Sequence, residues 1–173
     1  MPSDASQDQR YREAAEAYGP ALERLARGYE RDAHLRRDLL QDIHVALWRS
    51  LADFDGLCSL RTWIYRVAHN TATSYVLRRR RHTAGLAGLD EIADLSGPDD
   101  PEAAAGTRQA LDRLLALIHE LKPPDRQVAL LYLEDLDAAA IGEVTGLSPG
   151  AVAVRIHRLK AILAARFHAR RPS

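Results

Sequence analysis

Residues 138–163, AAAIGEVTGLSPGAVAVRIHRLKAIL, predict two helices joined by a tight turn, the pattern of a helix-turn-helix. Asp137 can cap the first helix, and Gly146 can take the positive φ that ends it. Ser148, followed by Pro149, can open the second helix. A plain helical hairpin is the alternative, but both caps and the turn glycine favour the helix-turn-helix. Its interior would be formed by Ile141, Val144, Leu147, Val152, Ile156 and Leu159.

The second helix of this motif leaves a face free for DNA. In a helix-turn-helix the second helix enters the major groove, where its side chains reach base edges and nearby phosphates. The candidates for the groove or the flanking backbone are Ala151, Ala153, Val154, Arg155, Arg158 and Lys160. Two more helical segments, 107–121 and 124–136, precede the motif on either side of a Lys-Pro-Pro break.

A second amphipathic helix is predicted at 36–51, RRDLLQDIHVALWRSL. Its apolar residues recur at spacings of three and four, which indicates one buried stripe: Leu39, Leu40, Ile43, Leu47 and Leu51. Beside that stripe lies a more polar face, formed by Asp38, Gln41, Asp42 and Val45. For an isolated helix, a solvated surface is the alternative reading of that face.

The stretch 61–82, RTWIYRVAHNTATSYVLRRRRH, predicts a further helix with an unusual exposed face. Trp63, Arg66, Asn70 and Ser74 follow one another at steps of three and four, so they share one side. An indole, a guanidinium and a carboxamide suit stacking on unpaired bases and bonding to their edges. The arginines at 78–81 can neutralise phosphates. The alternatives are a core position for Trp63 and a solvated helix end for the arginines.

The net charge of the chain is zero, but the charged residues are unevenly distributed along it. Residues 1–82 and 108–173 each carry a net charge of +3, whereas residues 83–107 carry six acidic residues and no lysine or arginine. The middle piece is rich in glycine, proline and aspartate, so we expect a flexible acidic linker. Its charge would keep it away from DNA.

Other classes of protein find little support. Cys58 is the only cysteine, which excludes an internal disulfide and a cysteine zinc site. No apolar run approaches the roughly 20 residues that cross a bilayer, so we expect no membrane insertion and a cytoplasmic location. The seven histidines are scattered without a catalytic or ligand motif. We therefore expect no enzyme activity, no metal and no cofactor.

Together these segments resemble a bacterial RNA polymerase sigma factor of the extracytoplasmic-function type. Residues 38–51 are similar to the family's helix that docks on the polymerase, 61–70 to its promoter-melting segment, and 141–163 to its second DNA-binding motif. The resemblance implies an all-α chain with two small helical domains. These are a sigma2-like bundle at 10–82 and a sigma4-like helix-turn-helix domain at 108–170, joined by the linker at 83–107.

The resemblance also implies partners and the residues that meet them. The partners are core RNA polymerase, through its β′ clamp helices and β flap, and promoter DNA; family members are also commonly held inactive by an anti-sigma factor. Core binding would fall to Asp38, Leu39, Gln41, Asp42, Val45 and Trp48. Recognition and melting of the −10 element would fall to Trp63, Arg66, His69, Asn70, Ser74, Arg78, Arg79, Arg80 and Arg81, with residues 53–60 as a loop that captures a flipped base. The −35 contacts would come from Ser148, Ala151, Ala153, Val154, Arg155, Arg158 and Lys160.

Some positions depart from the family pattern, namely His44, His69, Ser74, Leu77, Ala153 and Val154. These departures predict either an unusual promoter or weak DNA binding without polymerase. Two alternatives to the sigma-factor function follow. One is a stand-alone helix-turn-helix regulator, and the other is a sigma-like protein that acts by sequestering a partner.

Overall fold

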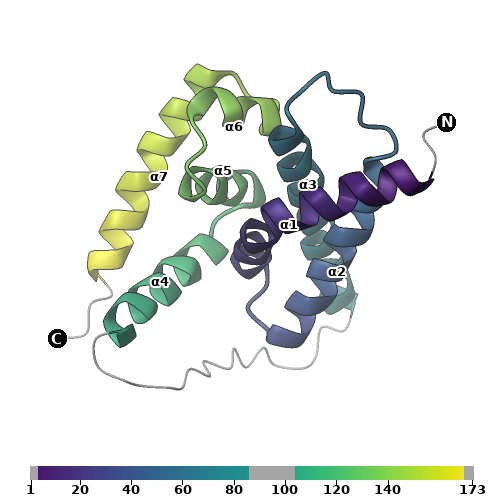
Figure 1. Ribbon diagram of the computed structural model, residues 1–173. Coiled ribbons are helices and arrows are strands. Elements are labelled where there is room, and N and C mark those ends of the chain that lie inside the picture. Colours follow the sequence, from purple (N-terminus) through teal and green to yellow (C-terminus); the bar gives the residue numbers. More distant parts are fainter. Residues whose placement is uncertain (1–3, 86–103, 170–173) are drawn as a thin grey trace.

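The computed structural model describes residues 4–85 and 104–169, and over those residues it contains helices and no strand (Figure 1). The all-α class is therefore confirmed. No helix in these two ranges is long and apolar enough to cross a membrane. The helices are α1 (Asp4–Tyr29), α2 (Ala33–Ser50), α3 (Leu60–Gly85), α4 (Ala104–His119), α5 (Pro123–Leu133), α6 (Ala138–Thr145) and α7 (Pro149–Ala169).

The first three helices pack as a bundle around the apolar stripe of α2. Asp32 caps α2, because its carboxylate accepts the backbone N–H groups of His34 and Leu35 at 2.8 and 2.9 Å. The stripe lies as predicted: Leu39, Ile43, Leu47 and Leu51 are buried, and Leu40 packs partly buried against them. From α3, Ile64, Tyr65, Ala68, Ala72 and Tyr75 complete the core of the bundle.

The helix-turn-helix of α6 and α7 is also confirmed, down to its caps. The Asp137 carboxylate accepts the Ala140 N–H at 2.8 Å, and Gly146 ends α6 with φ of 79°. The Ser148 hydroxyl accepts the Ala151 N–H at 3.2 Å, which caps α7. Of the predicted interior, Ile141, Val144, Val152 and Leu159 are buried, and Leu147 and Ile156 are partly buried against them.

Gly142 allows the backbone of the turn to lie close to α6. In α6, a Cβ atom on Gly142 would lie 2.6 Å from the backbone oxygen of Leu147. That oxygen belongs to the turn and cannot swing aside as a side chain does. Only a residue without Cβ therefore lets the chain fold back this tightly onto α6.

The predicted linker is shorter than expected at both ends. Helix α3 continues to Gly85 and α4 begins at Ala104, so 83–85 and 104–107 are helical. Residues 86–103, which hold the rest of the predicted acidic linker, lie outside the described residues.

The two halves of the chain pack on each other. Helix α6 lies beside the start of α3, and α4 lies beside the end of α1 (Figure 1). Buried residues of both halves belong to one apolar cluster. The guanidinium of Arg126 lies over the Tyr29 ring, 5.7 Å from its centroid. The two predicted domains are therefore in contact with each other in this conformation.

Replacement of Gly142 by alanine should destabilise the fold. The new methyl group must displace backbone at Leu147, and overpacking of this kind typically costs about 1–3 kcal/mol. Gly150 is the matched control, since a Cβ there meets nothing within 4 Å and alanine improves helix propensity. Urea unfolding followed by circular dichroism measures both. Equal stability of the two variants would contradict the close approach at Gly142.

Candidate functional site

The outer face of α2 carries most of the residues predicted to bind the polymerase. Asp38, Gln41 and Asp42 are exposed, and two apolar side chains beside them are also open to solvent, Val45 at 42% and Trp48 at 39% exposure. Leu39 does not belong to this surface. It is 0% exposed because it points into the bundle core, so the prediction that it contacts the polymerase is wrong for this structure.

Trp48 is held in place by the start of α1. Its indole N–H donates to the Asp8 carboxylate at 2.8 Å, and its backbone oxygen accepts from the Gln7 side chain at 2.7 Å. The ring therefore keeps one orientation while part of it faces solvent. A fixed aromatic beside acidic and amide groups is typical of an anchor in a protein interface.

The predicted base-reading face of α3 is only partly free. Asn70 and Ser74 are exposed. Trp63 is half-buried: its indole N–H donates to the Ser50 hydroxyl at 3.1 Å, and its ring packs on Phe54 with centroids 5.4 Å apart. Trp63 therefore supports the loop that follows α2.

His69 lies on the buried side of α3 and cannot touch DNA here. It is 1% exposed, and its Nδ1 is 2.8 Å from the hydroxyl of Tyr29. Burial lowers the pKa of His69 to about 3, so the ring is neutral. The prediction that it contacts the −10 element is therefore wrong for this structure: α1 covers this side of α3, and His69 is part of the core.

The arginine run at the end of α3 is divided between ion pairs and solvent. Arg78 is 3.4 Å from Asp42 on the outer face of α2, and Arg79 forms an ion pair with Glu30. Arg80 and Arg81 are exposed. Arg78 thus joins the basic run to the predicted polymerase face.

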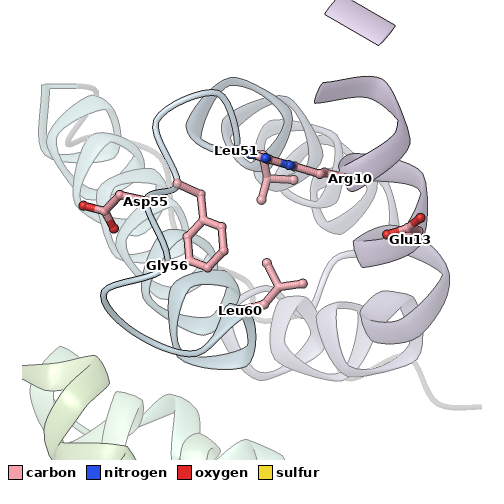
Figure 2. A pocket seen from close by; sticks show the side chains of 7 residues that line it. Arg10, Glu13, Leu51, Asp55, Gly56 and Leu60 are labelled. Atoms are coloured by element: carbon pink, nitrogen blue, oxygen red, sulfur yellow. The ribbon is translucent and has the colours of Figure 1, made fainter. Parts of the chain in front are cut away.

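A pocket of about 310 Å³ opens between α1 and the loop after α2 (Figure 2). Apolar side chains line it beside charged ones: Arg10, Glu13, Leu51, Phe54, Asp55, Gly56 and Leu60. Gly56 has φ of 79°, and the Asp55 carboxylate accepts the Leu57 N–H at 3.0 Å, so the loop has a defined turn. The sequence pointed to the loop but not to Arg10 and Glu13, because α1 reaches the loop only in the folded bundle.

The predicted DNA face of α7 divides in two. Ser148, Ala151 and Ala153 are exposed, and Val154 is 72% exposed. Arg155 and Arg158 both pair with the Asp125 carboxylate at the start of α5, at 3.3 and 3.1 Å. Lys160 lies elsewhere, with its ammonium group 4.6 Å from the centroid of the Tyr132 ring. The structure therefore separates Lys160 from the two arginines.

Lys160 borders an apolar groove that the sequence analysis missed. The groove has a volume of about 360 Å³ and runs between α4, α5 and α7, where it is lined by Leu114, Ile118, Ala129, Tyr132, Leu133, Ile156, Leu159, Lys160, Leu163 and Ala164. Among these, Tyr132 and Leu133 are more than one-third exposed. The available signal was the run of apolar residues from Val128 to Leu133, which is longer than the buried side of a short amphipathic helix needs.

His44, one of the departures, keeps an aromatic contact in the bundle. Its Nδ1 is 3.0 Å from the Tyr11 hydroxyl, and the two rings meet edge to face. Burial lowers its pKa. Ser74, Leu77, Ala153 and Val154 are all exposed, so those departures change the surface rather than the core.

Comparison with known proteins matches both halves of the chain. Residues 14–82 match the family model of sigma-70 region 2, and residues 111–163 match that of sigma-70 region 4. The chain is 31% identical over 159 residues to the RNA polymerase sigma factor CnrH of Cupriavidus metallidurans, covering 86% of this chain and 81% of CnrH. It is 25% identical over 140 residues to the ECF RNA polymerase sigma factor SigW of Bacillus subtilis, covering 73% and 72%.

Two solved structures resemble the whole described arrangement. CnrH in complex with the cytosolic domain of CnrY superposes with a TM-score of 0.70 at 27% identity, over 97% of this chain and 94% of CnrH. The sigma factor RpoE in complex with the anti-sigma factor NepR, from Bartonella quintana, gives a TM-score of 0.75 at 17% identity, over 94% and 99%. The second likeness concerns the fold alone.

Burial of His69 should make stability depend on pH. Its pKa is lower when folded than the ordinary 6.5, so below pH 6.5 the unfolded state binds a proton that the folded state does not. Stability is then lost as the pH falls from 6.5 toward 3, by about 1.4 kcal/mol per pH unit from this residue. Urea titrations at pH 7 and pH 5 should show a smaller loss for His69→Gln than for the natural protein. The control, His157→Gln, changes an exposed histidine and should keep the natural slope; an unchanged slope in His69→Gln would contradict the buried neutral ring.

Proposed function

Because the chain belongs to the sigma-70 family of RNA polymerase sigma factors and to its extracytoplasmic-function type, it is an alternative sigma factor that directs transcription, and we propose which of its surfaces performs each step. We place residues 10–82 as the domain that binds core polymerase and opens the −10 element, and residues 108–170 as the domain that binds the −35 element. The steps need binding and stacking alone, with no covalent chemistry and no cofactor. Their setting is the cytoplasm, where the polymerase and promoter lie.

The observation that carries the proposal is the outer face of α2. It presents Val45 and the fixed ring of Trp48 beside Asp38, Gln41 and Asp42, so apolar anchors lie next to charges that can set orientation. We assign this face to the β′ clamp helices of the polymerase. The assignment omits Leu39, because its side chain is buried in the core of the bundle.

The apolar groove between α4, α5 and α7 supplies a second polymerase contact. Its walls are leucine, isoleucine and tyrosine side chains, with Lys160 at the rim. Such a groove suits the apolar face of an amphipathic helix. We assign it to the β flap, and an anti-sigma factor is a competing occupant of the same kind.

For the −10 element we assign the exposed strip of α3 and the loop pocket. Asn70 and Ser74 can bond to base edges, and the exposed Arg80 and Arg81 can meet phosphates. The pocket beside Asp55 combines apolar walls with the charged groups of Arg10 and Glu13, which suits an unstacked base. Trp63 contributes by holding Phe54 and the loop in position.

For the −35 element we assign the exposed face of α7. Val154 and Ala153 can contact thymine methyl groups, and Arg158 can bond to guanine once it leaves Asp125. Because both Arg155 and Arg158 are paired with one carboxylate, duplex binding has to replace those ion pairs. This supports weak DNA binding by the free protein.

Charge reversal at Asp42 tests the polymerase face. Asp42→Arg should weaken binding to core polymerase about tenfold or more and reduce run-off transcription to match, because a like charge is placed against the partner's surface. The fold should persist, since Asp42 and its partner Arg78 are both half-exposed or more and such pairs contribute at most about 1 kcal/mol.

The matched control is Glu16→Arg, which makes the same charge change at an exposed site on α1. It should leave polymerase binding unchanged. If the natural protein and Asp42→Arg bound core polymerase with equal affinity, the assignment of α2 to the polymerase would be contradicted. A failure to support any run-off transcription with purified core polymerase would remove the proposal as a whole.

Two substitutions, with a third as a control, separate the roles of the two DNA faces. Arg158→Ala should weaken holoenzyme binding to duplex carrying the −35 element by about 1–3 kcal/mol, whereas Lys160→Ala, on the groove side of α7, should not. Asn70→Ala should spare duplex binding but reduce open complex, measured by permanganate-reactive thymines near the start site. If Asn70→Ala impaired duplex binding and left melting normal, α3 would not be the melting surface.

A further inference from the structure

We propose that Asp8, at the start of α1, is a positioning residue for polymerase binding, because it fixes the indole ring of Trp48 in the orientation that meets the polymerase. The inference rests on the proposed assignment of the outer face of α2 to core polymerase. It adds to that face a residue from another helix, which acts through Trp48 and not by a contact of its own. The first turns of α1 lie beside the end of α2 (Figure 1).

The hydrogen bond between the two side chains is short and has an ionised acceptor. The indole N–H of Trp48 donates to Oδ1 of Asp8 at 2.8 Å. A carboxylate is a stronger acceptor than a neutral oxygen, and the indole N–H is the only hydrogen-bonding group of a tryptophan side chain. Trp48 is nevertheless 39% exposed. Its polar group is thus satisfied inside the protein, and part of its ring is left for apolar contact with a partner.

The residue before Asp8 holds the main chain of the same tryptophan. Trp48 lies in the last turn of α2, where the N–H of Ala52 donates to the Arg49 oxygen at 3.3 Å, three residues earlier. That bond releases the oxygen of Trp48 from the helical pattern, and the last carbonyl groups of a helix need partners from elsewhere. The buried Gln7 side chain donates to this oxygen at 2.7 Å. Two consecutive residues of α1 therefore hold both the main chain and the side chain of Trp48.

Other contacts of α1 keep its first turns beside α2. About one turn after Asp8, the Tyr11 hydroxyl lies 3.0 Å from Nδ1 of His44 on α2. Farther along the helix, Ala14 and Leu22 are buried in the apolar core. These contacts do not involve Asp8, so its carboxylate can be removed without moving α1. The loss should then fall on the orientation of the Trp48 ring.

A ring that is fixed before binding gives a tighter complex than a ring that must be ordered during binding. Ordering a side chain at an interface costs about 0.5–1.5 kcal/mol, which corresponds to about two- to twelvefold in affinity. Changes at one interface alter the rate of dissociation more than the rate of association. We therefore expect Asp8 to prolong the complex with core polymerase by a factor in this range.

The match to the family model does not cover the residues that hold Trp48. The segment that matches sigma-70 region 2 begins at residue 14, so it includes Trp48 but neither Gln7 nor Asp8. Asp8 and Trp48 are also 40 positions apart in the sequence, and they meet only because α1 packs on α2. The contribution of α1 to the polymerase face therefore follows from the three-dimensional structure.

The test measures binding of the full-length protein to purified core polymerase by surface plasmon resonance. Asp8→Ala removes the acceptor and should raise the rate of dissociation about fivefold. Asp8→Asn keeps an oxygen that can accept the indole N–H but removes the charge, so it should keep most of the affinity. The matched control is Glu16→Ala, which removes a carboxylate from an exposed position of the same helix and should keep the natural rate. Circular dichroism should show natural helix content in each variant.

Two further measurements show whether Asp8 acts through Trp48. Trp48→Phe keeps an aromatic ring without an N–H, so Asp8→Ala should cause no further loss of affinity in that background. The two tryptophans of the chain give two indole N–H signals in a nitrogen-15 spectrum. In Asp8→Ala the ring of Trp48 should become more mobile on the picosecond-to-nanosecond timescale. Trp63, whose indole N–H donates to Ser50 at 3.1 Å, should not change.

The inference and the proposed function fail in different ways. If Asp8→Ala dissociates at the natural rate while Asp42→Arg and Trp48→Phe weaken binding, the inference alone is wrong. If Asp8→Asn loses as much as Asp8→Ala, or if Asp8→Ala costs as much again in the Trp48→Phe background, Asp8 does not act by holding the ring. If Asp42→Arg and Trp48→Phe both bind core polymerase as the natural protein does, the assignment of α2 fails, and the inference fails with it.

Discussion

Tyr29 is the point on which the packing of the whole chain depends. It ends α1, is buried, and meets two residues from different parts of the sequence. Its hydroxyl pairs with His69 of α3 at 2.8 Å, which ties α1 to the base-reading helix inside the first bundle. Its ring lies under the guanidinium of Arg126 from α5, which brings the second half of the chain to the same place. Burial raises the pKa of Tyr29 to about 12, so this junction stays uncharged on the tyrosine side.

Each side of this junction also bonds within its own half of the chain. The Tyr29–His69 contact lies within the first bundle and survives any separation of the halves. Arg126 donates through one guanidinium nitrogen to the backbone oxygens of His119 and Leu121, whereas its buried Nε has no hydrogen-bond partner among the described residues. Between the halves lie the bidentate pair of Arg24 with Glu134, the close packing of Gly28 on Leu130 and an apolar cluster to which both halves contribute.

How much the sequence could predict depends on how far apart the interacting residues lie. The helix-turn-helix was predicted correctly because Asp137, Gly146 and Ser148 act on their own neighbours. The stripe of α2 was predicted from spacing alone. The prediction for His69 was wrong because its neighbour across the core, Tyr29, comes from another helix. No feature of the sequence near position 69 indicates that this side of α3 is buried. The pair of Arg24 and Glu134 joins residues 110 positions apart, and neither residue stands out in its own segment. The loop pocket and the apolar groove arise in the same way, from helices that meet only on folding.

The most direct test of this account is whether the outer face of α2 contacts core polymerase. A photo-crosslinking residue at the exposed position Val45 on α2, with one at the exposed position Glu16 on α1 as the control, would report that contact. The account predicts a crosslink to the β′ subunit from position 45 and none from position 16. A crosslink from position 16 alone would contradict it, because the polymerase would then lie against α1 and not against α2.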